Sequence, residues 1–293
     1  MEKQKNTKKI VLITGCSSGF GLLTAVTAAK AGFEVVATMR NLSRDGRLKQ
    51  ALADAGVTAH IEQLDVTRPE EIQKIVEKYQ KIDILVNNAG ILMGGAFLSI
   101  SDAEAREVFE TDYFGAVELS RQVAKGMIER NSGMIINVAS LAGRVGHLFN
   151  SAYGAAKHAL IGFSKSIRLE LRPFNIKVVS VEPGYHKTGV IGNNANLCEN
   201  FHDRKSPMFA YNRGFFRLMT KEVIPRAGDP QKVADKIVKI MLSDNPRRHY
   251  IVGKDAKIAV VCQWLGLIGL IERLAYGKLL RNSQRAMKKK RKK

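Results

Sequence analysis

Residues 10–21 read IVLITGCSSGFG, and the residues that follow, LLTAVTAAKAG, have a helical pattern that ends at Gly32. A short apolar strand, a glycine-rich turn and a helix in this order predict a binding site for the phosphates of a dinucleotide. Gly15 would allow the sharp exit from the strand, Gly19 the close approach of a pyrophosphate, and Gly21 the close packing of helix on strand. The alternative is an ordinary strand-to-helix turn.

Further apolar strands alternate with helical segments along the chain. Strands are predicted over residues 34–39, 58–66, 82–90 and 249–253, and helices over residues 69–79 and 151–171. Apolar strand runs linked by helices are typical of a parallel sheet that is covered on both faces. The sequence therefore predicts an α/β fold, a doubly wound Rossmann-type parallel sheet, and the 293 residues fit a single domain with a full core.

The second predicted strand ends without an acidic residue. Enzymes that bind NAD usually carry Asp or Glu at this point, where it accepts hydrogen bonds from the adenosine ribose. This chain has Arg40 there, with Arg44 close behind. An arginine suits a 2′-phosphate, so the sequence favours NADP(H) over NAD(H). The alternative for Arg40 is an ordinary surface charge.

Three polar residues stand close together in the sequence, one before the predicted helix over residues 151–171 and two within it. Ser140 ends the apolar run MIINVAS, and Tyr153 and Lys157 lie four residues apart in YGAAK. This spacing places Tyr153 and Lys157 on one helical face, where the ammonium group would lower the pKa of the phenol. With Ser140 holding a carbonyl oxygen, the three form a predicted proton-transfer site for alcohol and ketone chemistry. The alternative is a half-buried tyrosine beside a solvated lysine.

Four motifs now agree in order and spacing: TGCSSGFG at 14–21, NNAG at 87–90, Ser140 with Tyr153 and Lys157, and PGYHKT at 183–188. Over roughly residues 8–255 they resemble the short-chain dehydrogenase/reductase family. The segment ATMRNLSRDGRLK and the TGCSSG form of the turn are most similar to the branch that contains 17β-hydroxysteroid and retinol dehydrogenases.

The resemblance implies an oxidoreductase that acts on CH–OH groups with NAD(P). Tyr153 would be the catalytic acid/base, Lys157 would lower its pKa and hold the nicotinamide ribose, and Ser140 would orient the substrate oxygen. Thr188 would lie near the carboxamide, and Asp65 and Val66 would flank the adenine. The full set of implied cofactor-binding residues is Gly15, Ser17, Ser18, Gly19, Phe20, Gly21, Arg40, Asp65, Val66, Asn88, Ala89, Gly90, Tyr153, Lys157, Pro183, Gly184 and Thr188. The resemblance also implies a homodimer or homotetramer.

One position departs from the family pattern. The family usually has an asparagine in the context FxTNxxG, whereas residues 109–115 read FETDYFG, so Asp112 takes the place of the amide. The resemblance implies that this amide holds a water that relays protons to the lysine. A carboxylate could accept from the same water and would strengthen the local field on Lys157. We therefore expect Asp112 to be a fourth catalytic residue, with retained activity and a shifted pH optimum.

Residues 184–228 form the least regular part of the chain, and in the resembling family this segment covers the substrate. It contains nine large apolar or aromatic residues: Tyr185, Phe201, Met208, Phe209, Tyr211, Phe215, Phe216, Leu218 and Met219. Such a lid suits a lipophilic alcohol or carbonyl substrate. The alternative is that these residues pack on the sheet edge.

A C-terminal extension follows the predicted domain of residues 10–255. Residues 258–271 are apolar except for Gln263, and fourteen residues are too few to span a bilayer core of about 30 Å. An apolar helix with a polybasic end predicts a peripheral anchor on an anionic membrane. In the alternative interpretations, the apolar helix packs over the substrate pocket or forms a dimer contact. In both, the lysine-rich remainder of the extension, residues 256–293, is a solvated tail.

The net formal charge of +20 lies mostly at the two ends of the chain. Residues 1–9 carry four lysines and one glutamate, and residues 273–293 carry ten Lys or Arg and no acid. No nucleic-acid partner is expected, because nothing aromatic or structured accompanies KKKRKK. The cysteines, Cys16, Cys198 and Cys262, have no pattern, which fits a reducing cytoplasm.

No metal site is expected, because the six histidines lack ligand spacing. His147 and His158 flank Tyr153 in the sequence, and simple packing is favoured for both over contact with a substrate. No signal peptide is expected, because MEKQKNTKK is followed only by an apolar run of strand length.

Overall fold

The computed structural model of the chain describes residues 8–188 and 196–290. Most of the predicted basic N-terminal tail, part of the predicted lid at 189–195 and the last three residues of the polybasic end therefore lie outside the described residues.

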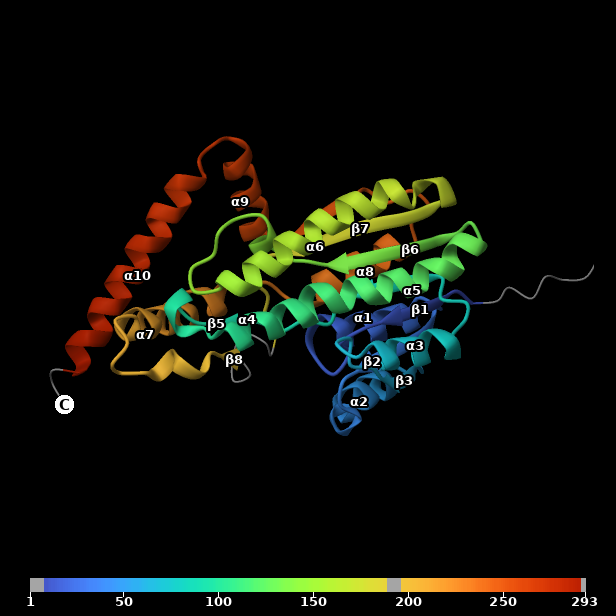
Figure 1. Ribbon diagram of the computed structural model, residues 1–293, viewed down its shortest axis with the longest axis horizontal. Helices are drawn as coiled ribbons and strands as arrows, with labels where there is room; N and C mark the ends of the chain where they lie inside the picture. Colours follow the sequence, from blue (N-terminus) through green and yellow to red (C-terminus); the bar gives the residue numbers. More distant parts are fainter. Residues whose placement is uncertain (1–7, 189–195, 291–293) are drawn as a thin grey trace, which may run out of the picture.

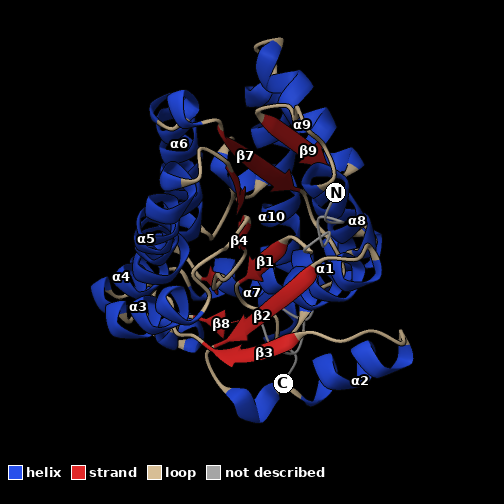
Figure 2. Ribbon diagram, turned by 90° about the vertical axis from the view of Figure 1, so that its right-hand side faces the viewer, coloured by secondary structure: helices blue, strands red, loops and turns tan. Residues whose placement is uncertain are grey.

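The described residues form a central sheet of seven parallel strands in the order β3-β2-β1-β4-β6-β7-β9 (Figures 1 and 2). The order reverses between β1 and β4, and in such sheets ligands bind outside the carboxyl ends of the strands at this switch point. The strands are β1 Ile10–Ile13, β2 Glu34–Met39, β3 His60–Gln63, β4 Ile84–Asn87, β6 Gly133–Val138, β7 Ile176–Pro183 and β9 His249–Val252. A small second sheet pairs β5 Met93–Gly94 with β8 Asn196–Leu197.

Helices cover both faces of the sheet and extend beyond one end of it. Their bounds are α1 Gly19–Lys30, α2 Gly46–Asp54, α3 Pro69–Lys78, α4 Asp102–Phe109, α5 Gly115–Glu129, α6 Ser151–Glu170, α7 Phe209–Leu218, α8 Gln231–Met241, α9 Lys254–Trp264 and α10 Ile268–Lys290. A π-helical turn, Glu110–Phe114, joins α4 to α5 without a break.

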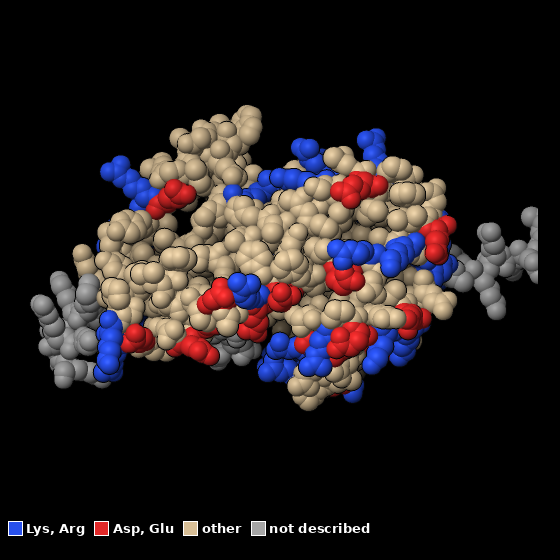
Figure 3. All heavy atoms as spheres, in the orientation of Figure 1, with Lys and Arg blue, Asp and Glu red and all other residues tan. Residues whose placement is uncertain are grey.

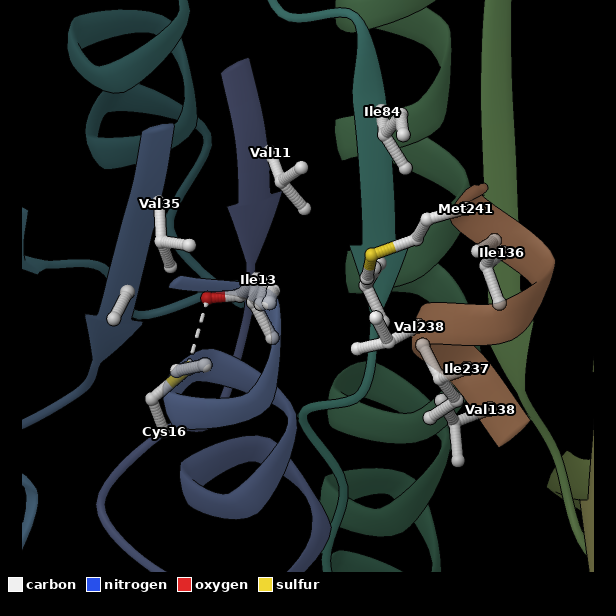
Figure 4. Packing of buried hydrophobic residues seen from close by; sticks show 14 of the residues in the cluster. Val11, Ile13, Cys16, Val35, Ile84, Ile136, Val138, Ile237, Val238 and Met241 are labelled. Atoms are coloured by element: carbon white, nitrogen blue, oxygen red, sulfur yellow. Dashed lines mark hydrogen bonds between the residues drawn. The ribbon is translucent and has the colours of Figure 1, made fainter. Parts of the chain in front are cut away.

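Alternate residues of the strands supply two separate cores, one on each face of the sheet. On one face, Val11, Ile13 and Val35 pack under α1 and α8, as the close-up in Figure 4 shows. On the other face, Leu12 and Val36 pack under α3 and α5. Burial of the strands on both faces explains their continuous apolar runs and confirms the predicted doubly wound sheet.

The structure corrects three details of the predicted elements. The strands predicted over residues 58–66 and 82–90 are shorter, because residues on both sides of β3 and β4 do not pair with a neighbouring strand in the sheet. The predicted lid is less irregular than expected, since it contains α7. The apolar stretch 258–271 is divided between two helices, α9 and α10, because Gly266 adopts a positive φ of 73° between them.

Helices α9 and α10 form a hairpin that stands away from the sheet, and α10 runs back alongside α7 (Figure 1). Leu279 of α10 is buried in a cluster with Phe201 and Phe215. Among the described residues, no helix is long and apolar enough to cross a membrane.

Candidate active site

A cavity of about 610 Å³ opens at the carboxyl ends of the central strands. Its wall contains every predicted site residue except Gly21, and thus joins residues that lie far apart in the sequence. The predicted residues that line it are Gly15, Ser17, Ser18, Gly19, Phe20, Arg40, Asp65, Val66, Asn88, Ala89, Gly90, Asp112, Ser140, Tyr153, Lys157, Pro183, Gly184 and Thr188.

The glycine-rich turn is held tightly against the loop after β4. Gly15 has a φ of 73°, and a Cβ there would lie 2.9 Å from the Cα of Ala89. The side-chain amide of Asn88 donates to the carbonyl oxygen of Thr14 at 2.8 Å, and the hydroxyl of Thr14 accepts from the backbone N–H of Ala89 at 2.9 Å. These contacts leave no room for a side chain at position 15.

Gly21 does not line the cavity, and it allows α1 to pack closely on the glycine-rich turn. A Cβ on Gly21 would overlap the carbonyl oxygen of Gly15, so only glycine allows α1 to start this close to β1. Ser18 precedes α1 and makes no capping hydrogen bond with its side chain. The first N–H groups of α1 therefore lie in the cavity wall without a side-chain cap, where the helix dipole favours an anion.

The end of β2 presents positive charge to the cavity. Arg40 and Arg44 are both exposed and both line it. Within the described part of the chain, neither pairs with an acidic side chain, and the nearby Asp45 is paired with Lys49. Two guanidinium groups without an acidic partner, in the same cavity wall as the glycine-rich turn, are suited to bind a phosphate.

Ser140, Tyr153, Lys157 and Asp112 come together at the inner end of the cavity. Lys157 lies with its Nζ 5.6 Å from the centre of the Tyr153 ring, and it donates a hydrogen bond to the carbonyl oxygen of Val138 at 3.2 Å. The Nζ of Lys157 is also 3.0 Å from Oδ2 of Asp112, and both side chains are almost completely buried. The hydroxyl of Ser140 accepts from the backbone N–H of Ala142 at 3.1 Å, which fixes its position at the end of β6.

Asp112 reaches the site from the π-helical turn between α4 and α5. Its Oδ1 accepts a hydrogen bond from the backbone N–H of Ile91 at 2.7 Å, and a Cβ on Gly90 would lie 3.0 Å from Oδ2. The carboxylate therefore connects the loop after β4 directly to Lys157. The sequence suggested a link through a water, whereas the structure brings the two charged groups into direct contact.

The buried charges determine the protonation of the phenol. Burial raises the pKa of Tyr153 above its ordinary value, Asp112 raises it further, and Lys157 and the hydrogen bond with Ser140 only partly oppose the rise. Lys157 lowers the pKa of this phenol as predicted, but the predicted net result, a pKa below the ordinary value, is wrong. The reason is that burial of the phenol outweighs the effect of Lys157, and Asp112 adds to the rise.

The charge of Lys157 is retained in spite of its burial. Burial lowers the pKa of Lys157, but the charge and hydrogen bond of Asp112, together with Tyr153, raise it above its ordinary value. Burial raises the pKa of Asp112, against the opposing effects of Lys157 and the Ile91 N–H. The ion pair thus keeps an ammonium group beside the phenol.

A second polar pair in the cavity wall was not predicted. The Nδ1 of His147 lies 3.1 Å from the hydroxyl of Tyr185, and burial lowers the pKa of His147. His147 therefore lines the cavity as a neutral ring, whereas His158 is exposed and bonds to the carbonyl of Gly154. Tyr185 lies within the PGYHKT motif, and this motif was the sequence feature that could have placed Tyr185 in the cavity wall.

The aromatic residues of the predicted lid contribute little to the described cavity wall. Of the nine, Tyr185 lines the cavity. Phe201 and Phe215 belong to a buried apolar cluster against which Tyr153 packs. Phe215 also stacks on Phe149, with the ring centres 5.0 Å apart. The described residues contain no group of His, Cys, Asp and Glu that could hold a metal ion.

Comparison with known proteins identifies the family. Residues 9–196, well over half of the chain, match the family described as short chain dehydrogenase. The chain belongs to this family. This short-chain dehydrogenase is 38% identical over 250 residues to retinol dehydrogenase 8 of Bos taurus, an alignment that covers 81% of this chain and 79% of that protein.

Solved structures agree with the family assignment. A short-chain dehydrogenase from Streptomyces avermitilis superposes with a TM-score of 0.76 at 32% identity, over 93% of this chain and 99% of that one. A tryptophan variant of actinorhodin polyketide ketoreductase, solved with NADPH, gives a TM-score of 0.70 at 31% identity, over 86% of this chain and 97% of that one. The chain is thus an oxidoreductase that interconverts carbonyl and alcohol groups with NAD(P).

Proposed function

We propose that this short-chain dehydrogenase uses NADP(H) to interconvert a lipophilic ketone or aldehyde and its alcohol, with Tyr153 as the acid/base. The observation that carries the proposal is the half-buried Tyr153 in the cavity wall, with Lys157 and Ser140 beside it. Because burial and Asp112 keep the phenol protonated at neutral pH, the site is suited to donate a proton, which is the requirement for carbonyl reduction.

The proton moves within this group of side chains. The hydroxyl of Ser140 holds the substrate oxygen, and the hydroxyl of Tyr153 donates its proton to that oxygen as negative charge develops there. The ammonium group of Lys157 stabilises the phenolate that remains. Asp112 acts through Lys157 as a positioning residue, since it holds the ammonium group together with the carbonyl oxygen of Val138.

The cavity fits the proposed cofactor. The glycine cradle and the N-terminus of α1 would hold the pyrophosphate, Arg40 and Arg44 the 2′-phosphate, and Asp65 and Val66 the adenine. Lys157 would hold the nicotinamide ribose, and Thr188 would lie near the carboxamide. When bound, the nicotinamide supplies or accepts the hydride.

Two observations support a lipophilic substrate. Tyr153 packs against the apolar cluster that contains Phe215 and Met93, and the similar bovine protein is named for retinol, an apolar alcohol. A substrate that contacts this cluster would bury apolar surface, and each Å² removed from water would contribute about 25 cal/mol to the binding free energy.

The test is NADPH consumption by the purified protein with ketones and aldehydes graded in apolarity, with NADH in parallel. We expect turnover that rises with apolarity and favours NADPH. Turnover that is fastest with small polar ketones would contradict the proposed substrate class. Equal turnover with NADPH and NADH would contradict the proposed cofactor preference.

The alternative is an NADP(H)-binding protein without catalysis. It is favoured by Asp112, which stands where the family usually has an amide. Binding of NADPH with no turnover of any carbonyl in the panel would support this alternative.

With either function, we propose a homodimer or homotetramer in the cytoplasm, associated with anionic membranes through the C-terminal segment.

A further inference from the structure

The α9–α10 hairpin carries a large share of the exposed apolar surface. Sixteen large hydrophobic residues in the described chain are exposed, and half of them lie between residues 258 and 276. They are Ile258, Val261, Trp264, Leu265, Leu267, Leu270, Leu274 and Tyr276. A concentration of this kind in a soluble domain marks a surface that is covered in use.

Trp264 and Leu265 lie at the corner of the hairpin, where Trp264 is 85% exposed and Leu265 is 55% exposed. No charged residue occurs between Lys257 and Glu272. In the view of Figure 3 the outer end of this hairpin is accordingly free of charged atoms. The corner is therefore an apolar projection with a tryptophan at its end.

The body of the protein holds the hairpin in place from both sides. Ala256 and Ala259 of α9 are buried against Leu141 and Val145, and the side-chain amide of Gln263 donates to the carbonyl oxygen of Arg144 at 2.9 Å. At the other side, α10 packs closely on α7. The corner is thus fixed in an exposed position, and its apolar residues do not fold back onto the domain.

The charge that follows the corner selects the kind of partner. After Glu272 the chain contains ten lysines or arginines and no acid. A second copy of the chain would bring the same positive charge to the contact and would be repelled. An anionic lipid surface would attract these charges, and its interfacial region is the preferred environment of an exposed tryptophan.

We propose that the α9–α10 corner inserts Trp264, Leu265 and Leu267 into the interface of an anionic lipid bilayer, whose headgroups attract the positive charge that follows Glu272 in the sequence. The proposal deepens the membrane association proposed above, because it assigns the contact to the folded corner rather than to the polybasic end alone. It does not depend on the identity of the substrate.

The chain provides its own reporter, since Trp264 is its only tryptophan. The experiment records the fluorescence of the full-length protein with vesicles of phosphatidylcholine, with and without phosphatidylserine. We expect a shift to shorter wavelength and quenching by brominated lipid with the anionic vesicles, both of which decrease at high salt. Emission that is unchanged by anionic vesicles would overturn the proposal, as would a shift that depends on protein concentration in the absence of lipid.

Two variants separate the corner from the basic end. The double substitution Leu265→Gln and Leu267→Gln keeps Trp264 and every charge, and should weaken vesicle binding by about tenfold or more. Leu242→Gln is the matched control, because Leu242 is 62% exposed at the end of α8, outside the hairpin. Retained NADPH binding would show that both variants are folded. Wild-type vesicle binding by the double variant would assign the membrane contact to the basic end and overturn the proposal.

Discussion

Asp112→Asn removes a buried carboxylate and leaves the size of the side chain almost unchanged. The amide oxygen can still accept the hydrogen bond from the Ile91 N–H, so the substitution removes mainly the charge that faces Lys157. At 3.0 Å the two charges attract each other by about 5 kcal/mol for an effective dielectric constant near 20. The variant also avoids the cost of burying a carboxylate, which is several kcal/mol.

The difference between these opposing effects sets the expected loss of stability. We expect roughly 1–3 kcal/mol of destabilisation, because Lys157 remains buried without its partner. For a domain of this size this corresponds to a fall in Tm of about 2–4 °C per kcal/mol.

The same substitution should change the pH dependence of catalysis. Asp112 raises the pKa of Tyr153, so its removal lowers that pKa and the phenolate forms at lower pH. Alcohol oxidation requires the phenolate as base. The rising limb of kcat/KM for oxidation should therefore move to lower pH, as should the falling limb for carbonyl reduction.

The assay compares pH–rate profiles in both directions with those of Asp102→Asn. Asp102 is a suitable control because its side chain is 81% exposed on α4 and pairs with Arg106 rather than with Lys157. The control should match the wild-type profile. A limb that stays in place or moves to higher pH in the Asp112 variant would refute the reasoning on the charges around Tyr153.

Three further substitutions test the rest of the site. Tyr153→Phe should lower turnover by about 10²–10⁴-fold and leave NADPH affinity, measured by fluorescence titration, nearly unchanged. Arg40→Ala should raise the KM for NADPH by about 10–100-fold with little effect on NADH, whereas Arg47→Ala, outside the cavity wall, should change neither. Gly15→Ala should abolish cofactor binding in an equilibrium titration because of the contact with Ala89. Gly46→Ala in α2, where an added Cβ would meet no atom within 4 Å, should be neutral or stabilising by thermal melt.

The sequence predicted the parts of the site that follow from local patterns. The glycine turn, the polar ends of the strands and the spacing of Tyr153 and Lys157 are all encoded within short segments, and the structure brings them to one cavity. The residues meet there because parallel strands all end at the same edge of the sheet.

The features that were predicted wrongly or missed depend on tertiary packing. The net pKa shift of Tyr153 follows from its burial and from Asp112, which lies 41 positions earlier in the chain. The pairing of His147 with Tyr185 joins segments 38 positions apart. A glycine at position 266 is a sequence signal for the end of a helix, so the division of the apolar extension could have been predicted. The exposure of the corner could not, because it depends on how α10 packs on α7.

The π-helical turn that carries Asp112 has a consequence for the lengths of related sequences. A π turn contains one residue more than an α-helical turn, and one residue corresponds to about 100° of rotation. Deleting Glu110 or Thr111 would allow α4 and α5 to merge into a regular helix. Residue 112 would then point away from Lys157, although every catalytic side chain would still be encoded. Relatives that differ in length should therefore carry their insertions and deletions outside this turn.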